Sequence, residues 1–405
     1  MTTTLDATRV VTRAPAPVAL PLPVRPSRRW MLRPLVVYAA SRALVFLTVG
    51  IVTTFGHADP GAGPWPVLGG PRIAFLRALG RWDSAWYLAI AHHGYRVETS
   101  PPGGHASDAF FPLFPMLIRG VSAALHVSPL IVGVVLTVLA GAGAAVAVWL
   151  LARRLAGPRV ADRAVALFCF FPGAFVLSMA YAEGLLVLAS AVCLLALLDR
   201  RWVLAGLSAA VATATRPNAA PIVLACLAAA IIATRRERDL RSWLAPLLAP
   251  LGGIAFFTFL WVRTGSFMGW FESERTTWRD HLDIGITAVH RVFQSITGPA
   301  PSLSPGGLNI QMVAVGAVLA IVGIVLMIQW RPPWPVLVFG VTTILMACAS
   351  VNVGPRPRLL LAAFPVAIAA GRKVHGRAFV ALLGISALAM AVLTGITISS
   401  LAATP

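Results

Sequence analysis

Long apolar runs, separated by short polar or basic stretches, make up most of this chain. Inside a lipid bilayer the backbone has no water to bind, so apolar runs of this length must be helical. The pattern therefore predicts an all-α, polytopic transmembrane helical bundle with about eleven spans, several of them shorter than the ~20 residues of a straight crossing and expected to be tilted or broken. The predicted helices cover residues 34–55, 129–151, 163–182, 184–199, 202–215, 217–234, 243–262, 308–330, 334–350, 357–371 and 377–400.

The composition supports lipid as the solvent for most of the chain. Of the 405 residues, 58% are hydrophobic and only 12% are charged. Soluble domains are nearer ~45–50% apolar and ~25% charged. A soluble protein of this size cannot bury so large an apolar fraction, and the composition therefore favours an integral membrane protein.

The basic residues give a net charge of +19 and set the predicted orientation. They gather between apolar runs, as in cytoplasmic loops, so nucleic-acid binding is not expected. Residues 1–28 are rich in Thr, Ala, Pro and Arg and are expected to be a disordered cytoplasmic tail, with residues 29–405 forming a single membrane domain. A cytoplasmic N-terminus places these basic segments inside: residues 153–163, 200–201, 235–241, 331 and 372–377.

Two long segments then lie outside the cytoplasm, at residues 56–128 and 263–307. In the first, apolar residues recur at helical spacing in Arg81–Gly94 and in Phe110–Leu125. This spacing predicts two amphipathic helices that lie in the membrane interface. The second segment carries a group of charged and aromatic residues: Glu272, Glu274, Arg275, Trp278, Arg279, Asp280 and Asp283.

Acidic residues are scarce, with 14 Asp and Glu in the whole chain, so those in the external segments are candidates for chemistry. Asp83 stands at the head of the first predicted interfacial helix. It could cap that helix through its carboxylate. Alternatively it could act as a general base, since carboxylates commonly accept the proton of a sugar hydroxyl as that hydroxyl attacks.

Four further charged residues stand near predicted helix ends. Glu183 lies where two apolar runs meet, and it is either a solvated loop residue or a site residue facing an outward cavity. Arg216 lies between two short runs, where it could grip a phosphate or simply extend from a loop. Arg356 and Arg358 form a similar external pair. Adjacent His92 and His93 point to different sides of a helix, so no metal site is expected.

Three motifs occur in order along about a third of the chain. They are Trp82-Asp83 with Tyr87 and Ala109-Phe110-Phe111-Pro112-Leu113-Phe114-Pro115, then Phe171-Pro172-Gly173-Ala174 with Ala180-Tyr181-Ala182-Glu183, and finally Ala214-Thr215-Arg216-Pro217-Asn218. Together these motifs resemble those of the PIG-V mannosyltransferase family. The chain departs from the usual family pattern at three positions, with Gly184 in place of Ser, Pro217 in place of Ser and Ala219 in place of Gly.

The resemblance implies a fold and an activity. Such enzymes belong to the GT-C superfamily, whose members take a sugar from a polyprenyl-phosphate carrier and place a catalytic Asp in the first external loop. Asp83 matches that Asp. The matching motifs make other residues candidates for binding the substrate or the donor phosphate: Trp82, Tyr87, Tyr181, Glu183, Arg216 and Asn218, with Arg356 and Arg358 as further phosphate ligands.

The resulting hypothesis is an inverting mannosyltransferase that moves mannose from polyprenyl-phosphate-mannose to a hydroxyl of a glycolipid or other glycan, with Asp83 as the base and no metal or cofactor. Three alternatives remain open: another polyprenyl-phosphate sugar such as arabinose or glucose, a transporter, or a non-catalytic scaffold. Arginine greatly outnumbers lysine, and Ala, Gly and Pro are abundant, as in GC-rich prokaryotes. We therefore expect a bacterial plasma-membrane protein with an extracytoplasmic site.

Overall fold

The computed structural model describes residues 28–56, 73–96, 106–298, 305–350 and 354–399. Within these ranges the chain is helical, and the extended backbone is limited to one isolated bridge between Leu282 and Ser350. The predicted all-α class is therefore confirmed for the described residues. The N-terminal tail was predicted over residues 1–28, and all of it except residue 28 lies outside the described residues.

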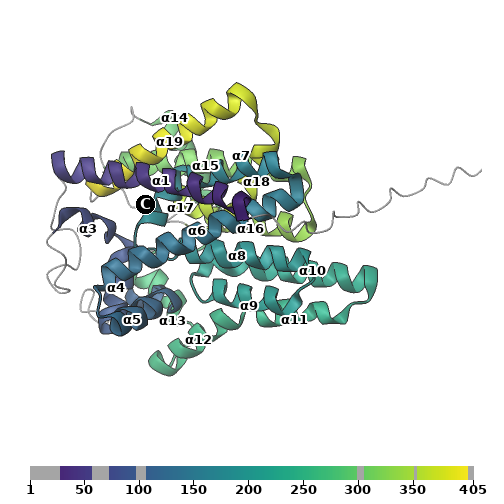
Figure 1. Cartoon of the computed structure of the whole chain (residues 1–405). Coiled ribbons are helices and arrows are strands. Elements are labelled where there is room, and N and C mark those ends of the chain that lie inside the picture. Colours follow the sequence, from purple (N-terminus) through teal and green to yellow (C-terminus); the bar gives the residue numbers. More distant parts are fainter. Residues whose placement is uncertain (1–27, 57–72, 97–105, 299–304, 351–353, 400–405) are drawn as a thin grey trace, which may run out of the picture.

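Six helical segments in the described part of the chain are long and apolar enough to cross a membrane, or seven if the bent pair α7 (Pro158–Cys169) and η2 (Pro172–Ser178) forms one broken span. Together they identify a multi-pass membrane protein (Figure 1). The six are α1 (Arg28–Phe55), α6 (Pro129–Ala156), η3 with α10 (Pro217–Ala219 and Ala220–Glu237), η4 to α12 (Leu240–Trp243, Leu244–Leu248 and Leu251–Thr264), α15 (Pro305–Trp330) and α19 (Gly376–Ser399).

Shorter elements complete the bundle. Every segment predicted to be a span contains helix. That all of these segments cross the membrane stays a prediction. The remaining elements are α3 (Ala74–Leu79), α4 (Asp83–His93), η1 (Ala106–Ala109), α5 (Leu113–Leu125), α8 (Glu183–Leu198), α9 (Trp202–Thr213), α13 (Gly269–Glu272), the π-helical turn η5 (Ser273–Thr277), α14 (Ile286–Thr297), α16 (Trp334–Cys348), α17 (Pro357–Leu360), η6 (Leu361–Ala363) and α18 (Pro365–Lys373).

The prediction of one continuous helix over 163–182 is wrong. The chain bends by 74° between α7 and η2, because Pro172 disfavours helical backbone in the residue before it. Arg42 of α1 supports the break from the interior, where it is 3% exposed. Its guanidinium donates to the carbonyl oxygens of Ala174 (2.7 Å) and Cys169 (3.2 Å). Irregular backbone at membrane depth is tolerated where such partners satisfy it.

Two other predicted helices are divided as well. The segment 243–262 becomes α11 and α12 around Ala249 and Pro250. The segment 357–371 becomes α17, η6 and α18, and α18 begins at Pro365. A proline lacks the amide hydrogen of a continuing helix, and the divisions before α12 and before α18 fall at Pro250 and Pro365.

Helix α6 lies at the centre of the bundle and packs against α7, α8 and α1. Small residues allow these close approaches, as is usual for helices in lipid. At Gly184, a Cβ atom would lie 2.9 Å from the Thr137 carbonyl oxygen and 3.1 Å from the Gly141 nitrogen. The departure from the family's Ser at this position therefore lets α8 lie directly on α6.

Helices α4 and α5 pack together within the first predicted external segment. Tyr87 of α4 stands edge-on to Phe114 of α5, with ring centroids 5.2 Å apart. Helix α5 buries Phe114 and Ile118 and exposes Leu125. Helix α4 is buried along most of its length. The location of both helices in the membrane interface stays a prediction.

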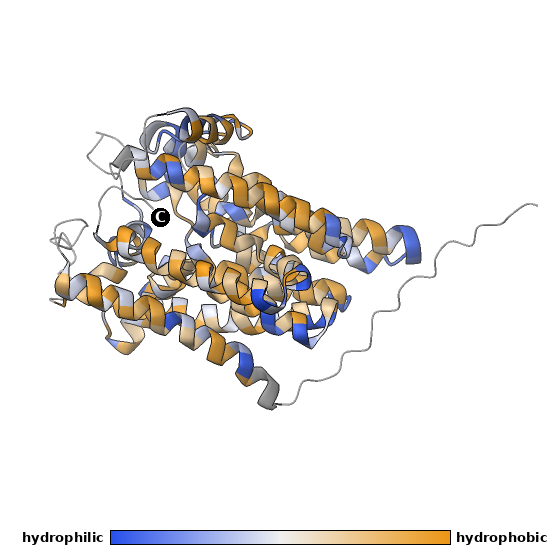
Figure 2. Ribbon diagram, turned by 90° about the horizontal axis from the view of Figure 1, so that it is seen from above, coloured by the Kyte–Doolittle hydropathy of each residue, from blue (hydrophilic) through white to orange (hydrophobic). Residues whose placement is uncertain are grey.

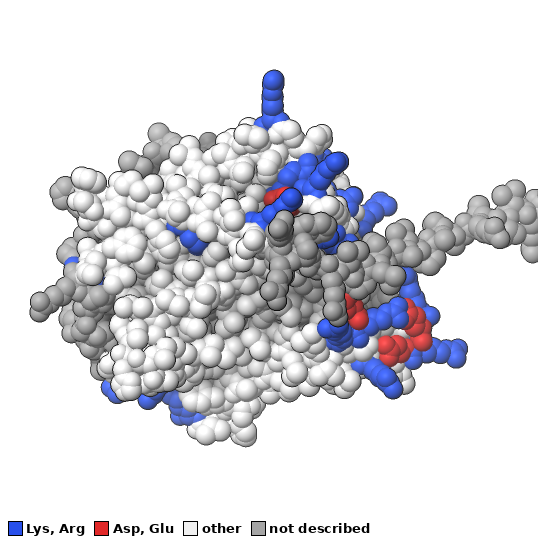
Figure 3. Space-filling view, viewed as in Figure 1, with Lys and Arg blue, Asp and Glu red and all other residues white. Residues whose placement is uncertain are grey.

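Apolar residues cover the outsides of the long helices, and hydrophilic residues gather near their ends (Figure 2). In the space-filling view, a broad face carries few charged side chains, while most of the visible charged side chains gather toward the right side (Figure 3). An uncharged belt beside a charged rim is the surface expected for a protein embedded in lipid.

Candidate active site

Asp83 is the first residue of α4, and the residue before it holds it in place. Trp82 has a left-handed backbone with φ of 59°, an uncommon conformation for an aromatic residue that is often found at functional sites. The Trp82 indole donates to the Thr397 carbonyl oxygen of α19 at 3.0 Å. The Asp83 amide donates to the Tyr181 hydroxyl at 3.2 Å. Position 83 is therefore fixed from α19 and from the segment between η2 and α8.

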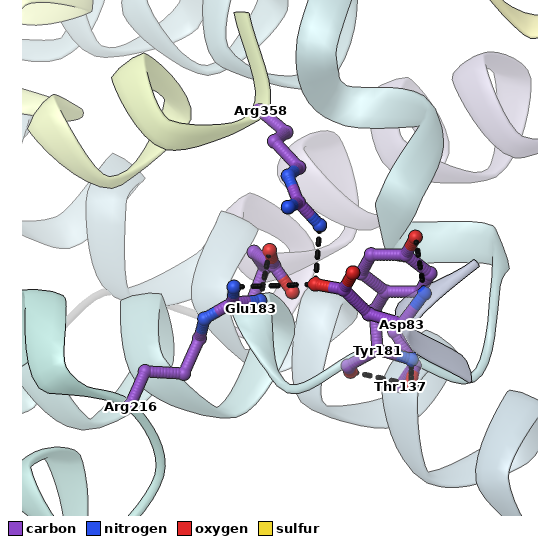
Figure 4. A network of polar contacts seen from close by, with 6 residues as sticks. All are labelled: Asp83, Thr137, Tyr181, Glu183, Arg216 and Arg358. Carbon is purple, nitrogen blue, oxygen red and sulfur yellow. Dashed lines mark hydrogen bonds and ion pairs between the residues drawn. The ribbon is translucent and has the colours of Figure 1, made fainter. Parts of the chain in front are cut away.

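The Asp83 carboxylate binds two arginines rather than capping its own helix. Arg358 of α17 donates to its Oδ2 atom, and Arg216 approaches the same oxygen at 3.4 Å from between α9 and η3. The two guanidinium groups reach the carboxylate from different sides (Figure 4). These three residues lie far apart in the sequence and meet only in the folded chain.

Glu183 completes the charged cluster. Arg216 donates through its Nη1 atom to Glu183 Oε1 and through Nη2 to Asp83, and so it bridges both carboxylates. The other Glu183 oxygen is buried without a hydrogen-bond partner among the described residues. Nearby, Thr137 accepts from the Tyr181 amide (3.2 Å) and donates to the Tyr181 carbonyl oxygen (2.8 Å), which fixes the backbone just before Glu183.

Exposure and charge separate the roles of the two carboxylates. The Asp83 side chain is 20% exposed, whereas that of Glu183 is 1% exposed, so only Asp83 can meet a substrate directly. Burial opposes the ionised form of Asp83, but the positive charges of Arg358 and Arg216 outweigh it and lower the pKa of Asp83. Asp83 is therefore ionised at neutral pH and can accept a proton.

A glycine brings Arg358 to the site. A Cβ atom on Gly173 would lie 2.6 Å from the Arg358 backbone nitrogen and would also collide with the Pro357 carbonyl group. Only a residue without a side chain lets η2 approach α17 so closely. The Phe171-Pro172-Gly173-Ala174 motif thus supplies both the chain break and the contact that places Arg358.

The other predicted site residues lie around this cluster at different depths. Tyr87 is 1% exposed and packs edge-on against Phe110 and Phe114. Asn218 lies in η3, two residues after Arg216, and its side-chain oxygen is buried without a hydrogen-bond partner among the described residues. Arg356 is buried and donates to Asn309 of α15 at 3.0 Å. Trp82 anchors α4 to α19. Ligand contacts by these residues stay predictions.

Sequence reasoning missed three contributors. Thr137 gave no signal, because its role depends on the packing of α6 against η2 and α8. Gly173 was part of a motif, but its contact with α17 is not visible in the sequence. Glu274 was one of several charged residues in the second external segment, and only in the folded chain do burial and the negative charges of Asp280 and Asp83 raise its pKa to about 7.

Arginines are the groups here that can bind an anion. In the part of the chain that the structure describes, no three His, Cys, Asp or Glu side chains form a group that could hold a metal ion. Arg216 uses both terminal nitrogens on carboxylates. Among the described residues, Arg358 forms an ion pair with Asp83 through Nη1, and its buried Nε atom has no hydrogen-bond partner. The site thus combines an accessible carboxylate with an arginine that retains donors.

Residues 73–244 match the family model described as mannosyltransferase (PIG-V), which confirms the resemblance seen in the motifs. The fold resembles ArnT from Cupriavidus metallidurans bound to undecaprenyl phosphate, with a TM-score of 0.50 and 14% identity over 89% of this chain and 63% of that one. This chain thus spans under two thirds of the length of ArnT.

The oligosaccharyltransferase of Archaeoglobus fulgidus gives a TM-score of 0.45 and 16% identity over 94% of this chain and 56% of its own. Among the curated proteins, none matches the sequence.

Proposed function

We propose that this chain, which matches the mannosyltransferase (PIG-V) family over residues 73–244, transfers mannose from polyprenyl-phosphate-mannose to a hydroxyl of a glycolipid or other glycan. The convergence of Asp83, Glu183, Arg216 and Arg358 carries the proposal. These residues come from four separated segments and form one cluster with an accessible carboxylate. A scaffold without chemistry has no need to hold such charges at low exposure, where they are costly.

The donor is proposed to bind through its phosphate. ArnT, which has a similar fold, was solved with undecaprenyl phosphate bound. In this chain, the unused donors of Arg358 make it a better phosphate ligand than Arg216, which the sequence had favoured and which both carboxylates already hold. Arg356 adds positive charge beside Arg358. These arginines neutralise the phosphate as it leaves, so the chemistry proposed here needs no metal.

Asp83 is the proposed base. The acceptor hydroxyl attacks the anomeric carbon as its proton moves to Asp83, and the bond from that carbon to the phosphate oxygen breaks with its electron pair. Arg216 and Glu183 hold the Asp83 carboxylate in position. A single displacement inverts the anomeric centre, so a β-linked donor gives an α-mannoside.

The proposal includes a membrane orientation. The basic segments between helices face the cytoplasm together with the N-terminus, and the Asp83 cluster lies on the extracytoplasmic side. All the predicted spans cross or enter the bilayer, and the membrane is a bacterial plasma membrane. The polyprenyl chain lies against the apolar outer surfaces of the helices.

The test is sugar transfer by the purified protein from polyprenyl-phosphate-mannose to a membrane lipid extract. Asp83→Asn removes the base and is expected to abolish transfer. Glu237→Gln is the control, because it makes the same carboxylate-to-amide change in an exposed ion pair with Arg200. Full transfer by a folded Asp83→Asn variant refutes Asp83 as the base.

The donor sugar is tested in the same assay. Polyprenyl-phosphate carriers with arabinose or glucose are offered beside the mannose donor. Faster transfer of one of these sugars refutes mannose as the donor sugar. If no sugar is transferred from any carrier, the proposal that this protein is a glycosyltransferase is refuted.

A further inference from the structure

Tyr181 lies inside the charged cluster and has no exposed surface. It stands in the short segment between η2 and α8, just before Glu183, and its relative exposure is 0%. A side chain without exposed surface acts on a site through its neighbours. The hydroxyl and the ring of Tyr181 contact two different members of the cluster.

The hydroxyl holds the backbone at Asp83. It accepts a hydrogen bond from the Asp83 amide at 3.2 Å (Figure 4). Asp83 is the first residue of α4, and the first N–H groups of a helix have no partner within that helix. The Tyr181 hydroxyl supplies this partner, so it fixes the point from which the Asp83 side chain leaves the backbone.

The ring of Tyr181 faces Arg358. The guanidinium carbon of Arg358 lies 5.7 Å from the ring centroid, which is within the ~6 Å range of a cation–π attraction. Both side chains are buried, so little water screens this attraction. The same guanidinium donates through Nη1 to Asp83 Oδ2. One ring therefore contacts the arginine, while its hydroxyl holds the backbone of the aspartate that the arginine binds.

Tyr181 is itself anchored to α6, the central helix of the bundle. The Thr137 hydroxyl accepts from the Tyr181 amide at 3.2 Å and donates to the Tyr181 carbonyl oxygen at 2.8 Å. The backbone of Tyr181 is thus held on both sides of its Cα atom. A fixed support of this kind is what keeps reacting groups in a productive geometry.

We propose that Tyr181 is a positioning residue, which holds Asp83 through its hydroxyl and Arg358 through its ring. The inference rests on the proposed function, in which Asp83 accepts the acceptor proton while Arg358 binds the departing phosphate. Both groups must be in place at the same moment. A neutral ring can hold a carboxylate-bearing backbone and a guanidinium without neutralising the charge of either.

The hydroxyl is tested with Tyr181→Phe, which keeps the ring. Loss of one hydrogen bond at the base is expected to lower kcat about tenfold, while the Kd for undecaprenyl phosphate stays at the wild-type value. Tyr38→Phe is the matched control. Tyr38 is 3% exposed, its hydroxyl donates to the Leu177 carbonyl oxygen at 3.3 Å, and Arg42 lies 5.1 Å from its ring centroid. This control is expected to keep the wild-type kcat.

The ring is tested by placing a polyfluorinated phenylalanine at position 181. Fluorine withdraws electron density from the ring face and so weakens the cation–π attraction, while the shape of the side chain is nearly kept. Relative to Tyr181→Phe, the Kd for undecaprenyl phosphate is expected to rise roughly tenfold. In an Arg358→Met background the same exchange is expected to leave the Kd unchanged, because no cation faces the ring. Fluorination at position 38 is expected to leave it unchanged as well.

The two readouts separate this inference from the proposed function, because the Kd is measured in lipid nanodiscs without turnover. Wild-type kcat in Tyr181→Phe, or an equal loss in Tyr38→Phe, overturns the role of the hydroxyl. A Kd that ignores fluorination, or that responds equally with and without Arg358, overturns the role of the ring. Either result leaves the proposed function standing. Absence of both transfer and undecaprenyl phosphate binding in wild type refutes the proposed function and this inference with it.

Discussion

Gly173→Ala tests whether the approach of η2 to α17 positions Arg358. The new Cβ would lie 2.6 Å from the Arg358 backbone nitrogen. Restoring an ordinary 3.4 Å contact moves that nitrogen by about 0.8 Å. Backbone atoms cannot rotate away as a side chain can, so α17 itself must shift. The Arg358 guanidinium then moves relative to the Asp83 carboxylate, although no charged residue has been changed.

The expected magnitudes separate catalysis from folding. A misplacement of about 1 Å can lower a rate by roughly 100-fold, and an extra methyl group in a packed interior lowers the free energy of unfolding by about 1–3 kcal/mol. We expect kcat to fall by roughly two orders of magnitude in a protein that still purifies as a folded species. The assay is mannose transfer in lipid nanodiscs, with thermal unfolding measured on the same sample.

Gly143→Ala is the matched control. Its Cβ would lie 3.2 Å from two side-chain atoms of Leu188, which can rotate, and it lies on α6 away from Arg358. It is expected to change stability slightly and to keep the wild-type kcat. Wild-type kcat in Gly173→Ala, or equal loss of kcat in both variants, would show that the close approach does not position Arg358.

Three further outcomes are expected. Arg216→Met leaves the Glu183 carboxylate buried without its arginine and lowers the free energy of unfolding by about 3–5 kcal/mol. Adding Glu183→Gln recovers part of that loss in a double-mutant cycle. Gly184→Ser introduces the family's usual residue where a Cβ would lie 2.9 Å from the Thr137 carbonyl oxygen, and thermal unfolding should show a loss of about 1–3 kcal/mol.

The structural similarity to ArnT is evidence for the fold of this chain and not for its substrates. The identity is 14% and the TM-score 0.50, which support a shared arrangement of helices. The substrate proposal depends instead on the PIG-V match over residues 73–244 and on the cluster around Asp83. The tests above are therefore directed at residues of that cluster.

The sequence by itself determined the helical class, the membrane setting and the candidate charges. Apolar length alone makes a segment helical in lipid, because its backbone must bind itself. The motifs around Asp83, Glu183 and Arg216 carried the resemblance to the PIG-V family, whose model matches residues 73–244, and scarce acidic residues directed attention to Asp83. These signals are local, so they could be read without knowing which helices are neighbours.

Only the tertiary structure decided how these charges meet. Arg358 lies 275 residues from Asp83 along the chain, and nothing local predicts their ion pair or the bridging of both carboxylates by Arg216. Pro172 explains the break between α7 and η2 locally, but the carbonyl groups freed there are satisfied by Arg42 of α1, which comes from another segment. Ion pairs and close backbone contacts depend on atoms brought together by packing, and that information is absent from any single stretch of sequence.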